Sequence, residues 1–162
     1  MRSKILVLLL FLIYLSALSQ SSSKYSNEFL NIGVDARSIG MANAVVSSTN
    51  DVNSTYWNPA GLINIETDEI SLMHSNYFAN IANYNYISYA KNIDDESAIG
   101  FSLIRFGVDD IMDTTQLIDN QGNIDFNRIE LFSAADYAFL FSYAKKNNFL
   151  NINYGLNVKI RR

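Results

Sequence analysis

Apolar and polar residues alternate without a break near the end of the chain. In a strand predicted over residues 149–161, every second side chain from position 150 is apolar, and those between are asparagine, glycine or basic. Successive side chains of a strand point to opposite faces, so a period of two predicts a β-strand with one apolar and one polar face. The apolar set is Leu150, Ile152, Tyr154, Leu156, Val158 and Ile160.

The same alternation predicts the strand before it, over residues 135–146. Aromatic side chains share one face of this strand, and mostly small or polar ones share the other. The aromatic set is Tyr137, Phe139, Phe141 and Tyr143. The Lys-Lys-Asn-Asn stretch at residues 145–148 predicts a short turn, so the two strands form a hairpin.

Three earlier segments carry weaker strand patterns, over residues 69–78, 83–91 and 97–106. Residues 92–96 predict a polar turn, and residues 107–133 predict a long loop rich in Asp and Asn. Loops longer than about 12–15 residues are uncommon in compact domains and are often functional. The pattern therefore predicts an all-β fold of about five strands, joined by alternating short turns and longer loops.

Residues 31–62 show no clean period and are rich in small side chains, which predicts compact, irregular structure. One short helix is expected within residues 35–44, and Val45 and Val46 are expected to start a strand. Residues 20–30 are polar and form the lead to this segment.

The N-terminus carries a secretory signal. Arg2 and Lys4 precede an apolar run over residues 5–15, and small residues at 17 and 19 predict cleavage before Gln20. The run is short for a membrane-spanning helix, which leaves an uncleaved anchor as the alternative. The predicted signal therefore covers residues 1–19.

Composition narrows the class of the exported part. The chain has no cysteine, which excludes a lipoprotein anchor, disulfides, thiolate metal sites and a cysteine nucleophile. Without Arg2 and Lys4, 10 of the 12 basic residues remain against 16 acidic ones, a net charge of about −6, which argues against nucleic acid. Charged residues are 17% and aromatics 13%. Because no later apolar run reaches membrane-helix length, the exported chain is either a secreted β-protein or a transmembrane barrel.

Candidate chemistry is sparse. His74 is the only histidine, so it cannot form a histidine pair for a metal. Asp119 and Glu130 have the spacing of a calcium loop, but Ile124 stands where that loop needs glycine. The acids Asp109, Asp110 and Asp113 leave a looser cation site open as an alternative to a solvated loop. No catalytic, cofactor-binding or metal-binding residue is predicted, and the chain is not expected to be an enzyme.

Two motifs carry a resemblance to a known family. Residues 33–44, Gly-Val-Asp-Ala-Arg-Ser-Ile-Gly-Met-Ala-Asn-Ala, are followed by Tyr-Trp-Asn-Pro-Ala-Gly-Leu at residues 56–62. At this spacing they resemble the opening of the PorV/PorQ family, within the wider group of barrels similar to FadL. Residues 132–138 resemble a segment from the middle of the same barrels. Asn43 departs from the family pattern, where a second glycine is more common.

The resemblance implies a barrel of more strands than this chain has, with the Asn-Pro-Ala segment folded into the lumen as a plug or hatch. The expected architecture is the N-terminal part of an antiparallel transmembrane β-barrel, truncated after about five strands. Residues 20–65 would be the lead and plug, and residues 66–162 the partial barrel. The residues expected to form the plug motif are Arg37, Gly40, Trp57, Asn58, Pro59, Ala60 and Gly61. If Arg37 lies in the lumen, it requires a nearby carboxylate; the alternative is a solvent-exposed helix charge.

The apolar strand faces have two interpretations, a lipid-facing band or the core of a soluble sandwich. The family resemblance favours the first. The residues then expected to face lipid are Tyr137, Phe139, Phe141, Tyr143, Ile152, Tyr154 and Leu156.

The resulting functional hypothesis is a non-enzymatic outer-membrane protein of a Gram-negative bacterium, acting as an accessory or shuttle component of type IX secretion. Its expected partners are outer-membrane lipid, secreted cargo proteins and other secretion-system components, without a cofactor. The alternatives are a FadL-like transporter of hydrophobic small molecules and a soluble secreted β-domain.

Overall fold

The computed structural model describes residues 27–118 and 122–162. The chain divides into two compact units, Met1–Asn31 and Ile32–Arg162. In the described part of the first unit, the 3-10 helix η1 (Glu28–Asn31) is closed by a hydrogen bond of 2.9 Å from the Asn31 amide to the Glu28 carboxylate. All other elements belong to the second unit. The predicted signal over residues 1–19 lies outside the described residues.

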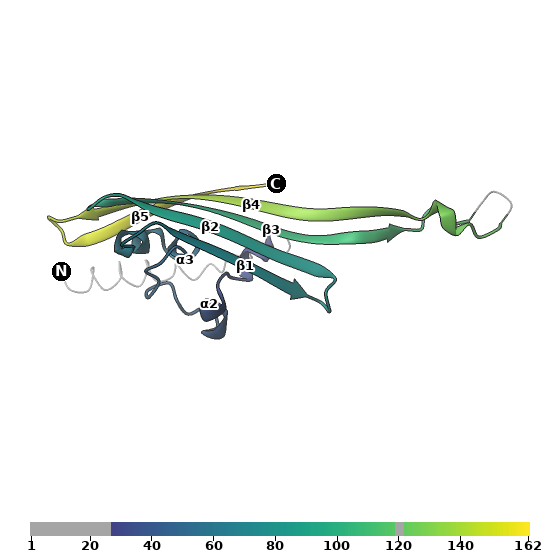
Figure 1. Cartoon of the computed structure of the whole chain (residues 1–162), viewed down its shortest axis with the longest axis horizontal. Coiled ribbons are helices and arrows are strands. Elements are labelled where there is room, and N and C mark those ends of the chain that lie inside the picture. The colour runs from purple at the N-terminus through teal and green to yellow at the C-terminus, as the bar shows by residue number, and fades with distance from the viewer. Residues whose placement is uncertain (1–26, 119–121) are drawn as a thin grey trace, which may run out of the picture. The chain divides into compact units, whose positions relative to one another are not determined.

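One antiparallel sheet forms the second unit's framework (Figure 1). Its five strands lie side by side in the order of the sequence, which confirms the all-β prediction. They are β1 (Glu69–Tyr77), β2 (Ala82–Asp94), β3 (Ser97–Asp113), β4 (Glu130–Asn147) and β5 (Ile152–Arg161). Each predicted strand corresponds to one of these.

The long loop predicted over residues 107–133 is wrong over part of its length. β3 continues to Asp113 and β4 starts at Glu130, so the hairpin extends past the end of the other strands in Figure 1 and its connection is residues 114–129. A register shift lies between Val108 and Ile111, where Asp110 has a φ of 58°. Such a bulge inserts an extra residue and breaks the period of two, which hid the continuation of the strand.

The turn predicted at residues 145–148 occurs later, at residues 148–151, because β4 stays paired as far as Asn147. The Asn147 side chain accepts hydrogen bonds from the N–H groups of Phe149 and Leu150, at 3.0 and 3.1 Å. This turn and residues 95–96 connect strands at one end of the sheet. At the other end, residues 78–81 form a short turn and residues 114–129 a long one, so the predicted alternation of short and long connections holds only in part.

Short helices precede the sheet. They are α2 (Ala36–Gly40), α3 (Ser54–Trp57) and η2 (Pro59–Asn64), while η3 (Phe126–Arg128) lies in the hairpin connection. Asp35 caps α2 by accepting a hydrogen bond of 3.2 Å from the Ser38 N–H, inside the range predicted for a helix. The strand expected at Val45 and Val46 is absent, because the Val45 carbonyl accepts hydrogen bonds from Ser48 and Thr49 and the chain turns there.

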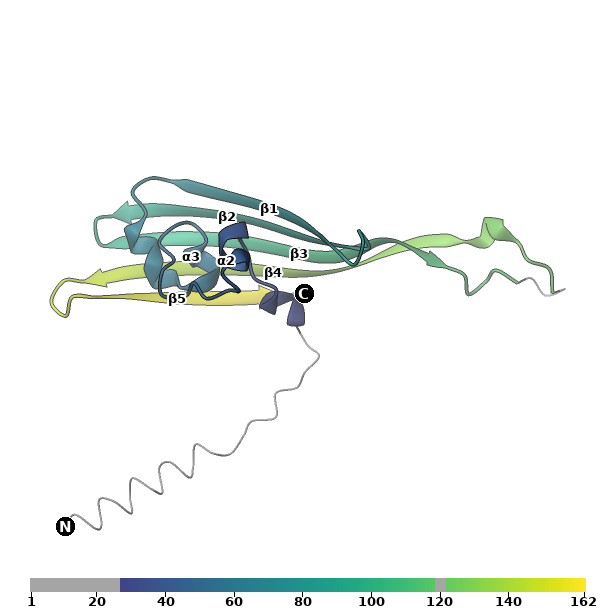
Figure 2. The same ribbon diagram turned by 90° about the horizontal axis from the view of Figure 1, so that it is seen from below.

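The two faces of the sheet differ in what covers them. α3 and η2 lie over one face, as Figures 1 and 2 show from two directions, and η2 contacts β2, β3, β4 and β5. Many residues of this covered face are small or polar, and those that are buried include Ser88, Ala90, Ala98, Ser102, Ala138, Ser142 and Ala144. Four larger side chains of the same face are buried as well: Tyr84, Tyr86, Ile104 and Leu140.

The opposite face is apolar and open. Residues paired across the strands form three successive rows on it, and most of their side chains are exposed. The rows are Leu72, Ile87, Leu103, Phe139 and Ile160; then Ile70, Tyr89, Phe101, Phe141 and Val158; then Ile99, Tyr143 and Leu156. We call these three rows the apolar belt. In the third row the partner of Ile99 on β2 is the charged Lys91, so the apolar belt on β2 ends at Tyr89.

Candidate functional site

The segment that carries the Asn-Pro-Ala motif lies against the polar face of the sheet, and we call residues 45–65 the plug segment. Asn58 is extended, with φ −157° and ψ 97°, as expected before a proline, and Pro59 begins η2. The Asn58 amide donates a hydrogen bond of 2.9 Å to the Val46 carbonyl, and its oxygen accepts one of 3.3 Å from the Ala60 N–H. This asparagine therefore fixes the shape of the turn that positions Pro59 and Ala60.

Two strand glycines let the plug segment touch the sheet backbone. A Cβ at Gly155 of β5 would overlap the Ala60 nitrogen and lie 2.6 Å from the Pro59 carbonyl carbon. A Cβ at Gly100 of β3 would overlap the Thr55 Cγ2 methyl group and lie 3.2 Å from Leu62 Cδ1. Both glycines belong to the polar faces recognised in the sequence, but only the structure shows that they are contact points.

Apolar contacts surround these glycine contacts. Val52, Leu62 and Ile65 of the plug segment form a buried cluster with alanines of three strands. The alanines are Ala90 of β2, Ala98 of β3 and Ala144 of β4. Their small side chains leave room on the sheet for the larger ones of the plug segment, so the two surfaces are complementary in size.

Thr55 is the centre of a buried hydroxyl cluster, and its side chain is fully buried. Its Oγ1 lies 2.9 Å from Ser88 Oγ and 3.3 Å from the Tyr86 hydroxyl oxygen, and it also hydrogen-bonds Ser102 Oγ. Its carbonyl accepts hydrogen bonds from Ser142 Oγ at 3.1 Å and from the Asn157 amide at 2.6 Å. One threonine thus connects the plug segment to β2, β3, β4 and β5.

Replacing Thr55 with valine should destabilise the plug segment by about 1–3 kcal/mol, because the strand hydroxyls would lose a buried hydrogen-bond partner. Thr55→Ser keeps the hydroxyl and is expected to lose much less. The measurement is urea unfolding of the full-length protein folded in detergent. Equal unfolding midpoints for the two variants would show that the hydroxyl cluster contributes nothing.

The predicted plug residues occupy different positions. Trp57 stacks edge-on against Tyr56, with ring centroids 4.7 Å apart, and its Nε1 donates a hydrogen bond of 3.4 Å to the Val34 carbonyl. Gly61 is buried, and a Cβ there would overlap the Thr49 carbonyl oxygen. Arg37 and Gly40 lie on α2 and are exposed. In the described part of the chain Arg37 has no carboxylate partner, which agrees with the solvent-exposed alternative.

The residues predicted to face lipid all lie on the uncovered face of the sheet. Phe139 is half-buried among its neighbours, and the others are exposed: Tyr137, Phe141, Tyr143, Ile152, Tyr154 and Leu156. The sequence pattern thus assigned them to one face, and the structure puts the plug segment on the other. Within residues 27–118 and 122–162, no helix has the length and apolar content needed to cross a membrane.

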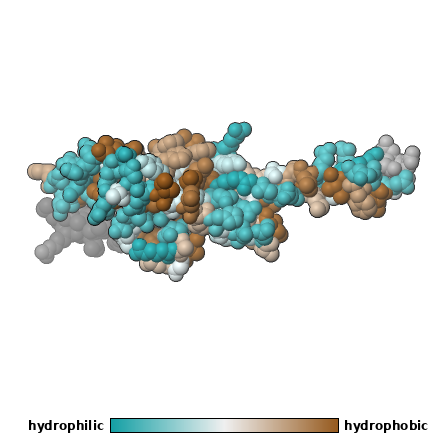
Figure 3. Space-filling model, in the orientation of Figure 1, coloured by the Kyte–Doolittle hydropathy of each residue, from teal (hydrophilic) through white to brown (hydrophobic). Residues whose placement is uncertain are grey.

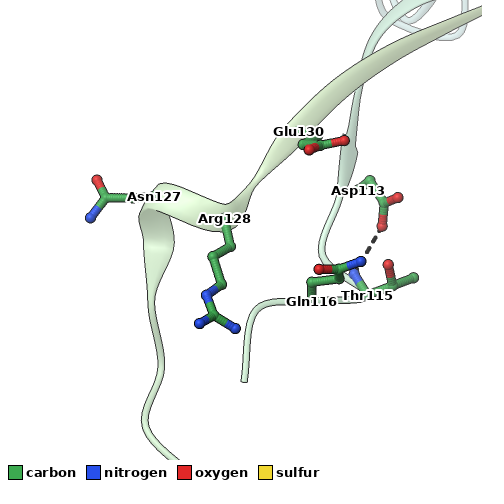
Figure 4. A pocket seen from close by; sticks show the side chains of 6 residues that line it. All are labelled: Asp113, Thr115, Gln116, Asn127, Arg128 and Glu130. Atoms are coloured by element: carbon green, nitrogen blue, oxygen red, sulfur yellow. Dashed lines mark hydrogen bonds between the residues drawn. The ribbon is translucent and has the colours of Figure 1, made fainter. Parts of the chain in front are cut away.

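A second candidate site lies in the connection of the β3–β4 hairpin, which sequence reasoning treated only as an acidic loop. A polar pocket of about 290 Å³ is lined by Asp113, Thr115, Gln116, Asn127, Arg128 and Glu130, as Figure 4 shows. The Asp113 carboxylate accepts a hydrogen bond of 2.9 Å from the Thr115 N–H, which keeps the pKa of Asp113 below its usual range. The pocket is therefore formed by carboxylates, amides and one guanidinium, groups that suit a peptide.

Apolar side chains flank this pocket on the hairpin. In Figure 3 hydrophobic side chains reach its surface between hydrophilic ones. They are exposed by half or more: Met112, Ile118, Ile124, Phe126, Leu131 and Phe132. A surface that mixes exposed apolar side chains with hydrogen-bonding groups is typical of protein-binding sites.

The remaining chemical candidates are separated by the structure. Asp119, needed for the calcium-loop spacing, lies outside the described residues. Asp109 forms an ion pair of 2.7 Å with Arg105, and among the described residues no three His, Asp or Glu side chains gather as metal ligands would. His74 is exposed on β1, where its Nδ1 lies 2.7 Å from Asn85 Oδ1.

The chain matches a known protein family. The family model described as type IX secretion system protein PorV matches residues 18–157, which include the plug segment and nearly all of the sheet. No curated protein and no solved structure matches the chain.

Proposed function

We propose that this chain, which belongs to the PorV family of type IX secretion system proteins, is a non-enzymatic barrel component that receives secreted cargo at the outer membrane. Membership in the family supports a role in type IX secretion. The barrel, the shuttle role and the position of the cargo site are the further steps that the fold supports.

The assignment to a membrane rests on one observation: the plug segment covers one face of the sheet and leaves the apolar belt on the other face uncovered. A soluble sandwich buries its apolar faces against each other. Here the covered face is mainly small or polar where the plug segment lies on it, with Ile104 and Leu140 as large apolar exceptions, while the large side chains of the apolar belt stay uncovered on the opposite face. This inverted arrangement is typical of a barrel whose outside contacts hydrocarbon and whose inside is polar.

The height of the exposed apolar face fits a membrane. On β5 the outward apolar side chains, which include those of the belt, run from Ile152 to Ile160, eight residues apart. At about 3.3 Å per residue this is about 26 Å along the strand, or about 20 Å across a membrane for a strand tilted by about 40°. Transmembrane barrels have an apolar band about 25 Å tall.

Cargo is proposed to bind the hairpin connection. In transmembrane barrels the long loops face outward and the short turns face the periplasm. The longest connection, residues 114–129, is beyond the apolar belt and carries both the polar pocket and the exposed apolar side chains. These features give a cargo domain an apolar contact and hydrogen-bonding partners at one place.

A shortened hairpin tests the cargo site. Asp113 and Glu130 are paired, so an Asn-Gly turn in place of residues 114–129 closes the hairpin without disturbing the strands. We expect the full-length variant to assemble in the outer membrane while the cargo that co-purifies with it falls at least about tenfold, the equivalent of about 1.4 kcal/mol.

The control for this experiment is the heat-dependent gel mobility of the folded barrel, which reports assembly independently of cargo. Unchanged cargo binding by a normally assembled variant would rule out the hairpin connection as the cargo site. Loss of secretion together with intact uptake of hydrophobic compounds would also separate the proposed role from the FadL-like alternative. The FadL-like alternative requires a hatch that moves. The close packing of Pro59 and Ala60 against β5 does not favour such movement.

A further inference from the structure

A row of polar side chains crosses the outward face directly above the apolar belt. His74, Asn85, Arg105 and Tyr137 are register partners on β1, β2, β3 and β4. His74 hydrogen-bonds Asn85, and Arg105 Nε donates a hydrogen bond of 3.3 Å to the Tyr137 hydroxyl. Along the outer side of this row, Arg105 Nη2 lies 2.7 Å from Asp109 Oδ1. We call these five side chains the polar row.

A groove of about 580 Å³ lies between the polar row and the apolar belt. Its apolar side is formed by Leu72, Ile87 and Leu103, which belong to the first row of the belt. Arg105 and Tyr137 line it from the polar side. The groove thus offers an apolar floor and a charged edge, the shape and chemistry of a site for an acyl chain joined to a polar head.

The chemistry of the polar row indicates what the head carries. A guanidinium has five N–H donors, and the contacts with Tyr137 and Asp109 use two of them, so further donors can bind a phosphate. The carboxylate of Asp109, the amide of Asn85 and the imidazole of His74 are partners for hydroxyl groups. The ion pair of 2.7 Å with Asp109 holds the Arg105 guanidinium beside the groove.

We propose that the groove binds a phosphorylated glycolipid of the outer leaflet, with one acyl chain on Leu72, Ile87 and Leu103, the phosphate on Arg105 and sugar hydroxyls along the polar row. This inference rests on the proposed membrane function, since it needs the apolar belt to face lipid. The polar row is at the end of the belt that carries the long hairpin, which is the outward end in a transmembrane barrel. The outer leaflet of a Gram-negative outer membrane consists largely of such phosphorylated glycolipids.

The test measures lipid bound to the full-length protein by native mass spectrometry after exchange into detergent with defined lipids. The lipids are lipid A, dephosphorylated lipid A and phosphatidylethanolamine, each added alone. Wild-type protein should retain lipid A, and Arg105→Leu should retain at least about tenfold less, a factor expected from the loss of a charge-assisted phosphate contact. Dephosphorylated lipid A should bind wild-type protein as weakly as lipid A binds the variant.

Two further variants separate this site from general effects. Ile87→Trp adds bulk to the apolar floor of the groove, leaves every residue of the polar row in the sequence, and should also reduce lipid A binding. Arg37→Leu, which removes an exposed arginine of α2, should not change it. Equal retention of phosphatidylethanolamine and lipid A, or equal retention by Arg105→Leu and wild type, would overturn the proposal.

Assembly is recorded in the same samples by heat-dependent gel mobility. A protein that assembles in the membrane but shows no lipid preference refutes the lipid site and leaves the proposed function standing. A protein that never enters the membrane refutes both. A photo-crosslinker at position 87 that reacts with a protein subunit instead of lipid would show that the groove belongs to a protein interface, which also overturns the lipid site.

Discussion

Arginine in place of Phe141 is expected to block assembly of the protein into the outer membrane. Phe141 lies in the middle row of the apolar belt, and half of its side chain is exposed. The centroid of its ring lies 5.1 Å from that of the Phe101 ring. At the midplane of a bilayer, arginine on the lipid-facing side of a barrel strand costs about 2–4 kcal/mol. This is a large part of the stability of an ordinary domain, so little folded protein should accumulate.

Two controls separate the effect of lipid from the effect of packing. Phe141→Leu loses the ring contact but stays apolar, so it should assemble nearly as well as wild type. Asn153→Arg introduces the same charge on the opposite face of β5 and should also be tolerated. The readout is the heat-modifiable fraction of full-length protein in washed outer membranes.

Depth within the belt provides an internal check. Leu156 belongs to the row nearer the short turns, so Leu156→Arg should cost less than Phe141→Arg, because the penalty falls toward the membrane interface. Equal assembly of Phe141→Arg and wild type, or a soluble protein recovered without detergent, would contradict lipid contact at the belt.

The second large effect is expected from Gly155→Ala, which should displace the plug segment from the sheet. The added Cβ would meet backbone atoms of Pro59 and Ala60, and backbone cannot move aside as a flexible side chain can. Overpacking of this kind costs about 1–3 kcal/mol. Gly100→Ala should have a smaller effect, since the first atom it meets is the Thr55 side-chain methyl group.

The chain has no cysteine, so a single introduced cysteine can be labelled without background. A cysteine introduced at Ser54, which is fully buried in the plug segment, reports the seating of this segment through its rate of labelling by a maleimide in full-length, membrane-assembled protein. Labelling should accelerate in Gly155→Ala. Gly40→Ala is the matched control, because a Cβ at Gly40 meets no atom within 4 Å. If both variants label at the wild-type rate, the contact of η2 with β5 does not hold the plug segment in place.

Strand prediction succeeded where the alternation of side chains was uninterrupted. In β5 each outward position is apolar and each inward one is small or polar. In β4 the same alternation runs over residues 138–144, with Leu140, which is buried on the inward face, as the exception. Prediction failed where the backbone interrupts the period. The bulge at Asp109 and Asp110 concealed the end of β3, and the Asn147 side chain moved the turn by several residues. Both are local backbone geometries that composition does not reveal.

For the plug segment, sequence reasoning predicted the local shape but not the contacts. Asn58 and Pro59 predict the turn, and the family resemblance predicts that the segment lies beside the strands. No pattern along the chain indicates which strand atoms the plug segment contacts. Thr55 meets Ser88 and Ser102, and Pro59 meets Gly155, across separations of tens of residues.

The sequence by itself determined the all-β class, the two-faced strands and the shape of the Asn-Pro turn, because each depends on neighbouring residues and their backbone preferences. Only the tertiary structure decided which face of the sheet is covered. It also decided that glycines and alanines receive the plug segment, and that His74, Asn85, Arg105 and Tyr137 form one row. These arrangements depend on strand register and on packing between distant segments, which a period of two leaves undetermined.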